Sequence, residues 1–418
     1  MRLSLRKLIS NRSNEMNPKK LKDTDKTLKN VFEIPVPYGW AVKRMIQEPD
    51  KDKRKIIFFG NDLDGIIDLG VDKEKYIARV NQCLNFLRKH YAGYQLYLKP
   101  HPASMNEADF LDLKGFTIID DKTTSEIFLW KNWGQIHSVF AVNSWSTFGA
   151  YSMGLNAHLF YRYFADIFGG KFFEQMEDMF FRMPASFFIG DLNDRPLDNA
   201  PVLKADDLLE GDLKKILNNN KGTVWLNISA TEYVVLMVAL AKLIKKTDPS
   251  RKVALIVSRH RRWNIINLDD IRDHFDEIVI MPRVYYTLRP RRLLTAIRTS
   301  WKIRRFPIAP QDIFISASQV EFVENCFVSY HKKNIRIGLV MNRDFHTHYS
   351  QDSLAYIRND DFRFSKGSWF FNRIFEPILG LNRSVFMYYE QGEGIYITRY
   401  QKPINTVFDR VYLLNNVL

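Results

Sequence analysis

The chain has 418 residues, of which 46% are hydrophobic and 14% aromatic, a composition that excludes a disordered protein and suffices for two or three globular domains. Lysine and arginine exceed aspartate and glutamate by 61 to 47, and the net charge of +14 favours anionic partners such as sugar nucleotides, acidic glycans, lipid head groups or nucleic acid. The two cysteines, Cys83 and Cys326, argue against a disulfide framework, and no stretch approaches the ~18 apolar residues that span a bilayer.

The first part of the chain, residues 1–40, is predicted to be a tail and linker. Residues 1–9 are basic and amphipathic but lack the apolar core and cleavage site of a signal peptide. Residues 10–30 are rich in Asn, Lys and Asp, and a short strand is expected at 31–36. We expect a cytoplasmic protein, with peripheral attachment to the inner face of the membrane as an option.

A first compact domain is predicted over residues 41–221. Its first strand, 56–59, ends in a polar loop that begins with Asn61 and Asp62, and residues 73–90 have the apolar spacing of a helix. At the carboxyl end of such a strand, these two polar residues could contact a base, a ribose or an acceptor. Turn formation is the simpler explanation of each residue taken alone.

The next predicted strand, 95–98, runs directly into Lys99, Pro100, His101 and Pro102. The two prolines fix φ on both sides of the histidine, so the imidazole is held on a stiff segment at the carboxyl edge of the sheet. Such a segment suits a phosphate contact or a catalytic acid. A strand end followed by a solvated turn is the alternative.

A third strand is predicted at residues 136–142, and the segment that follows is rich in side-chain hydroxyls and opens a helix. Its polar residues are Asn143, Ser144, Ser146 and Thr147. Hydroxyls and free backbone N–H groups at a helix N-terminus bind anions well, so the segment predicts a phosphate cradle. Ordinary N-capping by one of the hydroxyls is the alternative.

Aromatic residues crowd the segment 161–189, which we interpret as a domain interface. A stacking platform for nucleic acid is disfavoured, because lysine and arginine are not interleaved with the rings. A short helix is expected at 208–217, and residues 218–222 form a break that marks the domain boundary.

Residues 222–418 are predicted to form a second domain in which strands and helices alternate. The expected strands are 223–228, 253–257, 277–281, 312–315 and 335–340. This alternation predicts a second Rossmann-like, doubly wound and largely parallel sheet, so the fold class is α/β.

The most basic part of the second domain is the segment 283–305, where basic residues alternate with leucine, isoleucine, tyrosine and tryptophan. We predict that it binds an anionic acceptor or a membrane surface through Arg291, Arg292, Arg304 and Arg305. A solvated helix face is an equally good interpretation.

The Lys-Pro-His-Pro sequence at a strand end, followed by a strand and a Ser-x-Ser/Thr cluster, resembles the nucleotide-binding half of bacterial sialyltransferases and polysialyltransferases. Related capsule transferases that use CMP-linked 3-deoxy sugars are similar. The resemblance implies a GT-B fold, in which two Rossmann-like domains face a cleft. It also implies that His101, Ser144, Ser146 and Thr147 contact the CMP phosphate, with His101 as general acid. The predicted donor site also includes Lys99, Asn61, Asp62 and Asn143.

In that family an acidic motif in the other half carries the general base, and the closest match is residues 389–396. Gln391 stands where the family has an acid, and an amide cannot take up a proton at neutral pH, so the resemblance transfers the base to Glu390 or Glu393. The two halves also occur in reversed order. A permuted enzyme and a remnant of tandem genes are the two explanations of this order.

The predicted function is an inverting, metal-independent glycosyltransferase that moves sialic acid or a related sugar from a CMP donor to a glycan in capsule or surface polysaccharide synthesis. A catalytically degenerate glycan-binding or scaffolding homologue, and a transferase for another nucleotide sugar, are the alternatives. Expected partners are the nucleotide sugar, an anionic glycan, and the inner membrane surface or capsule assembly proteins. Nucleic acid is not expected as a partner, since no recognised nucleic-acid-binding motif occurs. No cofactor and no metal are expected, because no third ligand stands near His346 and His348.

Overall fold

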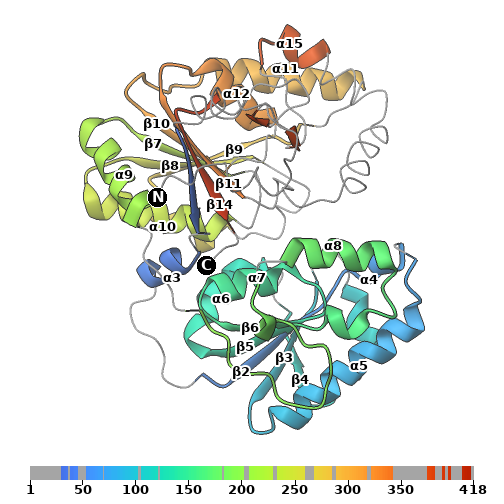
Figure 1. The fold of residues 1–418 in the computed structure, drawn as a ribbon. Helices are drawn as coiled ribbons and strands as arrows, with labels where there is room; N and C mark the ends of the chain where they lie inside the picture. Colours follow the sequence, from blue (N-terminus) through green and yellow to red (C-terminus); the bar gives the residue numbers. More distant parts are fainter. Residues whose placement is uncertain are drawn as a thin grey trace, which may run out of the picture.

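Two parallel β-sheets with helices around them, and one two-stranded antiparallel sheet, form the part of the chain that the computed structural model describes (Figure 1). The described residues are 30–35, 38–45, 53–68, 70–101, 105–120, 123–180, 183–201, 207–228, 233–258, 268–284, 289–317, 322–341, 374–381, 388–390, 394–396 and 407–415. We call the five-stranded sheet with its helices the first half, and the seven-stranded sheet with its helices the second half.

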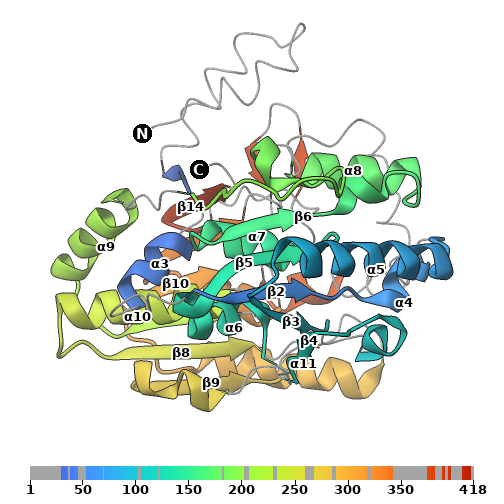
Figure 2. The same ribbon diagram turned by 90° about the horizontal axis from the view of Figure 1, so that it is seen from below.

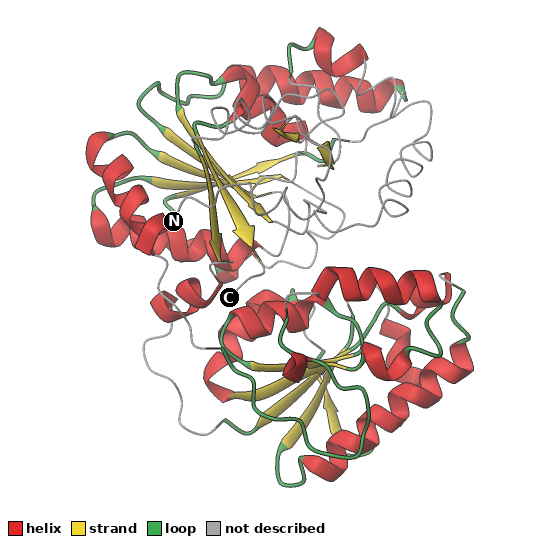
Figure 3. Ribbon diagram, in the orientation of Figure 1, coloured by secondary structure: helices red, strands yellow, loops and turns green. Residues whose placement is uncertain are grey.

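The first half has parallel strands in the order β4-β3-β2-β5-β6, with helices on both sides of them (Figure 3). The strands are β2 (Lys55–Phe59), β3 (Gln95–Lys99), β4 (Phe116–Ile118), β5 (Ile136–Ala141) and β6 (Asn156–Leu159). The helices are α4 (Leu63–Asp68), α5 (Lys73–His90), α6 (Ser125–Asn132), α7 (Trp145–Ser152) and α8 (Gly170–Phe180), with a 3-10 turn, η1, at Met105–Phe110.

The second half has parallel strands in the order β1-β14-β11-β10-β7-β8-β9. The strands are β1 (Val31–Pro35), β7 (Val224–Ile228), β8 (Val253–Ser258), β9 (Glu277–Met281), β10 (Ile313–Ala317), β11 (Ile335–Met341) and β14 (Arg410–Asn415). The helices are α3 (Tyr38–Met45), α9 (Asp207–Asn219), α10 (Val234–Thr247), α11 (Pro290–Arg304), α12 (Phe322–Tyr330) and α15 (Glu376–Ile378).

Both sheets have the same strand order. Numbered along the chain within each half, the first sheet runs 3-2-1-4-5, and the second runs 3-2-1-4-5-6 with β1 added beyond β14. This is the order of doubly wound nucleotide-binding folds, in which ligands bind outside the carboxyl ends of the strands where the winding reverses. The prediction of an α/β chain with two parallel sheets is therefore confirmed.

Local sequence explains why the helices form where they do, and α5 is an example. Asp72 caps its N-terminus by accepting a hydrogen bond from the Lys75 N–H at 2.9 Å, and three basic residues occupy its last turn. Tyr76, Val80 and Leu87 lie on its buried face. The predicted helix over residues 73–90 is confirmed with the same bounds.

The N-terminal strand belongs to the second half, which differs from the predicted tail over residues 1–40. Val31 of β1 pairs with Val411 of β14, and the Asn30 side chain donates to the Phe408 carbonyl at 3.0 Å. The helix α9 lies within the predicted first domain but also contacts the second sheet, because Asp212 accepts a hydrogen bond from the Tyr412 hydroxyl at 3.1 Å. The two sheets are thus not divided along the chain at the predicted limits.

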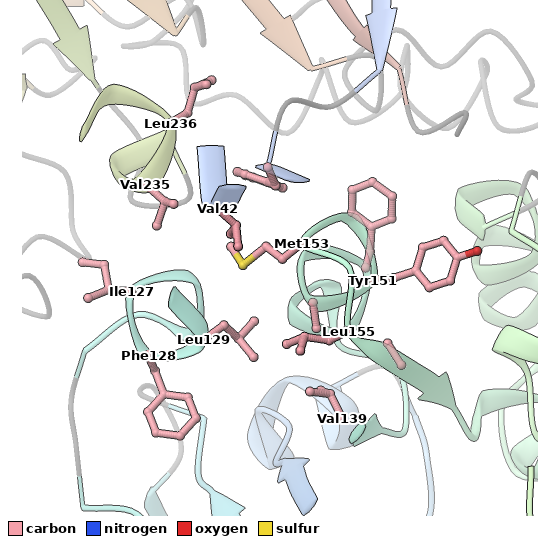
Figure 4. Close-up of a cluster of buried hydrophobic side chains, with 14 of the residues drawn as sticks. Val42, Ile127, Phe128, Leu129, Val139, Tyr151, Met153, Leu155, Val235 and Leu236 are labelled. Carbon is pink, nitrogen blue, oxygen red and sulfur yellow. The ribbon is translucent and has the colours of Figure 1, made fainter. Parts of the chain in front are cut away.

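The two halves share one apolar core. Helix α3 packs against α10 and α7, and α10 also packs against α6. In this region Val42, Met153 and Val235, from three separate segments of the chain, are all buried (Figure 4). An ion pair between Lys131 and Asp270, with 2.7 Å between Nζ and Oδ1, also joins the halves. Burial of the apolar side chains between these helices, away from water, holds the two sheets together.

Several rings of the aromatic segment 161–189 pack against helices of the first half. Phe164 and Phe168 lie beside the ring of Tyr76 on α5, and Phe180 lies beside Trp145 on α7. A buried ring removes much apolar area from water, so the segment fills the space over the sheet.

Among the described residues, no helix combines the length and the apolar character needed to cross a bilayer.

Candidate functional site

The candidate site lies at the carboxyl edge of the first sheet, where the winding reverses between β2 and β5. On the last rung of the ladder, Phe59 of β2 pairs with Lys99 of β3 on one side and with Ala141 of β5 on the other. The Gly60 N–H continues the pairing by donating to the Lys99 carbonyl at 2.9 Å. Three strand ends are therefore aligned at this edge.

Two residues beyond that rung, the three strand ends carry Asn61, His101 and Asn143. Neighbouring strands lie about 4.8 Å apart, so residues from three distant segments of the chain occupy adjacent positions. The structure thus brings together the His-Pro segment, the polar loop after β2 and the hydroxyl-rich segment after β5. Their grouping at one edge was predicted from the sequence.

The basic members of this edge differ in exposure. Lys99 is only 3% exposed, and its ammonium lies 5.5 Å from the centre of the Phe128 ring, a favourable cation–π contact. His101 is half-buried at the end of the described segment, which stops before Pro102. A direct contact with a ligand therefore suits the imidazole better than the ammonium.

The hydroxyl-rich segment has a defined order of hydrogen bonds. Ser144 is the N-cap of α7 and accepts from the Ser146 N–H at 3.2 Å, as the capping alternative predicts. The Ser146 hydroxyl lies 2.5 Å from the Ser125 hydroxyl of α6. Thr147 is fully buried, and neither its hydroxyl nor the Asn143 side-chain oxygen has a hydrogen-bond partner among the described residues. Burial leaves Thr147 without surface for direct contact.

Two helix N-termini meet at this edge. The hydrogen bond between Ser125 and Ser146 joins the first turn of α6 to the first turn of α7, and each helix has eight residues. The positive ends of both helix dipoles therefore point to the same region, which favours a bound anion. The buried side chain of Glu126, in the first turn of α6, opposes part of this effect.

A buried glutamate that the sequence analysis missed holds the loop after β2. Glu107 is 1% exposed, and its Oε2 accepts from the Asn61 N–H at 2.8 Å. A Cβ atom at Gly60 would lie 2.4 Å from the same oxygen, so the glycine makes room for the carboxyl group. Burial raises the pKa of Glu107 to about 8, Asp62 adds to the rise, and hydrogen bonds from Asn61 and Tyr76 oppose it.

Hydrogen bonds near Glu107 account for the positions of the two polar residues of the loop, Asn61 and Asp62. The Asn61 side chain donates to the Tyr76 hydroxyl at 2.6 Å, and Asp62 accepts from the Gly65 N–H at 3.4 Å at the start of α4. Asn61 is thus fixed by the core, and Asp62 caps the N-terminus of α4 instead of forming the turn that the alternative interpretation predicts. Glu107 carries no signal in the sequence, because it stands in a short polar segment and is buried only by tertiary packing.

The equivalent edge of the second sheet holds a buried polar network. Asn227 of β7 pairs with Ser316 of β10, and its side chain donates to the Ser316 hydroxyl at 3.0 Å. Ser316 donates in turn to Glu324 at 2.7 Å, and Ser258 donates to Asn227 at 3.4 Å. These hydrogen bonds satisfy groups that would be costly to bury alone.

The remaining predicted site residues lie in the second half, in the separate two-stranded sheet or outside the described residues. Glu390 ends β12 (Tyr388–Glu390), which pairs with β13 (Gly394–Tyr396) in an antiparallel hairpin. Glu393 lies outside the described residues, as do His346 and His348.

The predicted basic residues lie on or next to α11, where Arg291, Arg304 and Arg305 are exposed and Arg292 is half-buried. In the described part of the chain, no group of three or more His, Cys, Asp or Glu side chains could hold a metal ion.

Comparison with known proteins gives no match: no family model, no curated protein and no solved structure is similar to this chain. The function is therefore inferred from the strand order and from the polar groups at the carboxyl edge of the first sheet.

Proposed function

We propose that the chain is a glycosyltransferase of the GT-B type that transfers sialic acid or a related sugar from a CMP donor to a glycan acceptor. The observation that carries the proposal is that His101 after β3 and Ser144 and Ser146 at the start of α7 lie at the same carboxyl edge of the first sheet, where Ser146 also joins two helix N-termini. Anionic nucleotides bind at such points in doubly wound sheets.

The arrangement of the two sheets is compatible with a GT-B enzyme. Figure 2 shows the arrowheads of β2 and β6 pointing to the same side as that of β8, so strands from both halves end on one side of the molecule. A donor at the first edge and an acceptor from the second half could therefore approach from that side. The proposed location is the cytoplasm, since Cys83 and Cys326 are both buried thiols.

In the proposed reaction the positive helix ends, the Ser146 hydroxyl and the His101 imidazole stabilise the negative charge that develops on the departing CMP phosphate. His101, when protonated, also donates a proton to that phosphate. Glu390 or Glu393 removes the proton from the acceptor hydroxyl that attacks the sugar. No metal is needed for this scheme.

The first prediction concerns nucleotide binding. CMP should raise the melting temperature of the full chain more than UMP or UDP does, and His101→Ala should reduce the effect. At ~100-fold excess over Kd, a bound nucleotide stabilises a protein by roughly 2.7 kcal/mol, which differential scanning fluorimetry detects readily. His90→Ala is the matched control, since His90 ends α5 at the opposite edge of the sheet. Equal shifts with all three nucleotides, or none, would contradict the CMP assignment.

The second prediction concerns the general base. A base typically contributes ~10²- to 10⁴-fold, so Glu390→Gln or Glu393→Gln should lower turnover of a CMP-sugar by that range while leaving the CMP-induced shift intact. Transfer is measured by CMP release with a polysaccharide acceptor. Turnover that survives both substitutions would remove these residues from the role, and Asp62 and Asp64 would be tested next.

Gln391 favours a second candidate function, a glycan-binding homologue without transferase activity. An amide in place of an acid leaves the motif without its usual proton acceptor. Retained CMP and glycan binding, together with no turnover and no gain from Gln391→Glu, is the result expected for this candidate.

A further inference from the structure

Helix α11 is held in the second half by one narrow face. Ala296, Thr299, Ser300 and Ile303 are buried, and their spacing of three and four residues places them on one side of the helix. This helix packs against α12. Figure 1 shows α11 and α15 on the outer side of the second half, away from the five-stranded sheet.

The opposite face of α11 carries large apolar side chains in contact with solvent. Leu294 is 50% exposed, Ile297 42% and Trp301 56%, and their spacing forms one stripe along the helix. Ile378 on α15 is 75% exposed, and α15 lies beside the end of α11, where Arg304 donates to the Leu379 carbonyl at 3.5 Å. A helix face that only met water would have polar residues at these positions.

Basic side chains border this apolar stripe. Arg291, Arg298, Lys302 and Arg305 are all exposed, and with 3.6 residues per turn they lie next to the stripe. The Arg305 guanidinium lies 3.6 Å from the centre of the Trp301 ring. The sequence of α11, PRRLLTAIRTSWKIR, contains no acidic residue.

We propose that α11, together with the end of α15, is a docking surface for a membrane that contains anionic phospholipids. Leu294, Ile297 and Trp301 enter the boundary between head groups and acyl chains, and the bordering basic residues contact the lipid phosphates. The inference does not depend on the proposed transferase activity.

The combination of basic and apolar side chains on α11 favours a membrane over other anionic partners. An anionic polysaccharide or a nucleic acid backbone would be bound by the basic residues alone, and neither gives a reason to expose leucine and isoleucine. A helix that lies in a membrane interface needs both features, with tryptophan at the boundary. The structure also refines the predicted contacts, because Arg292 is half-buried and Arg304 contacts the Leu379 carbonyl.

The test is co-sedimentation of the full chain with vesicles of phosphatidylcholine and phosphatidylglycerol, compared with phosphatidylcholine alone. We expect binding to the mixed vesicles that weakens as salt is added. The triple variant Arg298→Gln, Lys302→Gln, Arg305→Gln should lower the partition coefficient on the order of 100-fold. The variant Leu294→Ser, Trp301→Ser should lower it at least about 10-fold.

The control for charge is Lys89→Gln, Lys215→Gln, Lys221→Gln, which removes three exposed lysines from other parts of the chain. The control for apolar surface is Leu197→Ser, at a side chain that is 78% exposed. Both controls should bind vesicles as the unmodified chain does.

A second measurement reports insertion without changing the charge. Lipids brominated in the acyl chains should quench tryptophan fluorescence of the unmodified chain, and Trp301→Phe should remove most of that quenching while keeping vesicle binding. Absence of vesicle binding, equal binding by all variants, or retention on polysialic acid without vesicle binding would overturn the proposal.

Discussion

At the scale of single residues, Glu107 sets the charge of the edge where the donor is proposed to bind. Burial and Asp62 raise its pKa to about 8, so the neutral acid predominates at neutral pH. A neutral carboxyl group still accepts the Asn61 N–H at 2.8 Å, but it does not repel a phosphate. The site thus keeps a fixed loop without adding a negative charge.

The third prediction is that Glu107→Gln makes the chain less sensitive to alkaline pH. The pKa of Glu107 rises from 4.5 to about 8 on folding, so its stabilising contribution is complete below about pH 4.5 and is lost as the pH rises through 8. The variant cannot ionise, so relative to the unmodified chain it should gain up to ~2.7 kcal/mol in free energy of unfolding between about pH 6 and about pH 9. Urea denaturation at these two pH values measures the difference.

Glu177→Gln is the control for this prediction. The Arg162 guanidinium beside Glu177 lowers the pKa of that carboxyl group, so its contribution is lost only in acid. The control should show the same pH dependence as the unmodified chain between about pH 6 and pH 9. Identical pH profiles for Glu107→Gln and Glu177→Gln would mean that folding does not raise the pKa of Glu107.

At the scale of elements, the strands that the sequence predicts are those with continuous apolar runs. β2 is an example, because Ile56, Ile57 and Phe58 are all fully buried and the run stops at Gly60. A parallel strand covered on both faces needs such a run, so the pattern is visible without the fold. The hydroxyl-rich segment was likewise placed correctly before a helix, since Ser144 has the chemistry of an N-cap.

The features that sequence reasoning missed depend on partners far away in the chain. β1 was predicted as a strand, but its partner β14 begins at Arg410, and no local pattern reveals that pairing. The bond between Ser125 and Ser146 joins two helices that were not paired from the sequence. The role of Glu107 could not be predicted from the sequence either, because only tertiary packing buries this side chain.

At the scale of the whole molecule, one apolar core runs through both halves. Tyr76 of α5 and Tyr412 of β14 belong to the same cluster of buried side chains, and α3 and α10 connect the two sheets. A second cluster, which contains Val328 of α12, lies in the second half. The continuous core predicts that the two halves unfold together, although the chain is long enough for separate domains.

The last prediction tests this coupling with two buried valines, Val80 in α5 of the first half and Val328 in α12 of the second half. Val80→Ala and Val328→Ala should each cost about 2 kcal/mol, because each deletes buried methyl groups and leaves a cavity. If the halves unfold as one unit, calorimetry should show a single transition, and each variant should lower its midpoint by about 2 °C, since the unfolding entropy belongs to the whole chain. The calorimetric and van't Hoff enthalpies should then agree. Two transitions, of which each variant lowers only one and by roughly twice as much, would show that the shared core does not couple the halves.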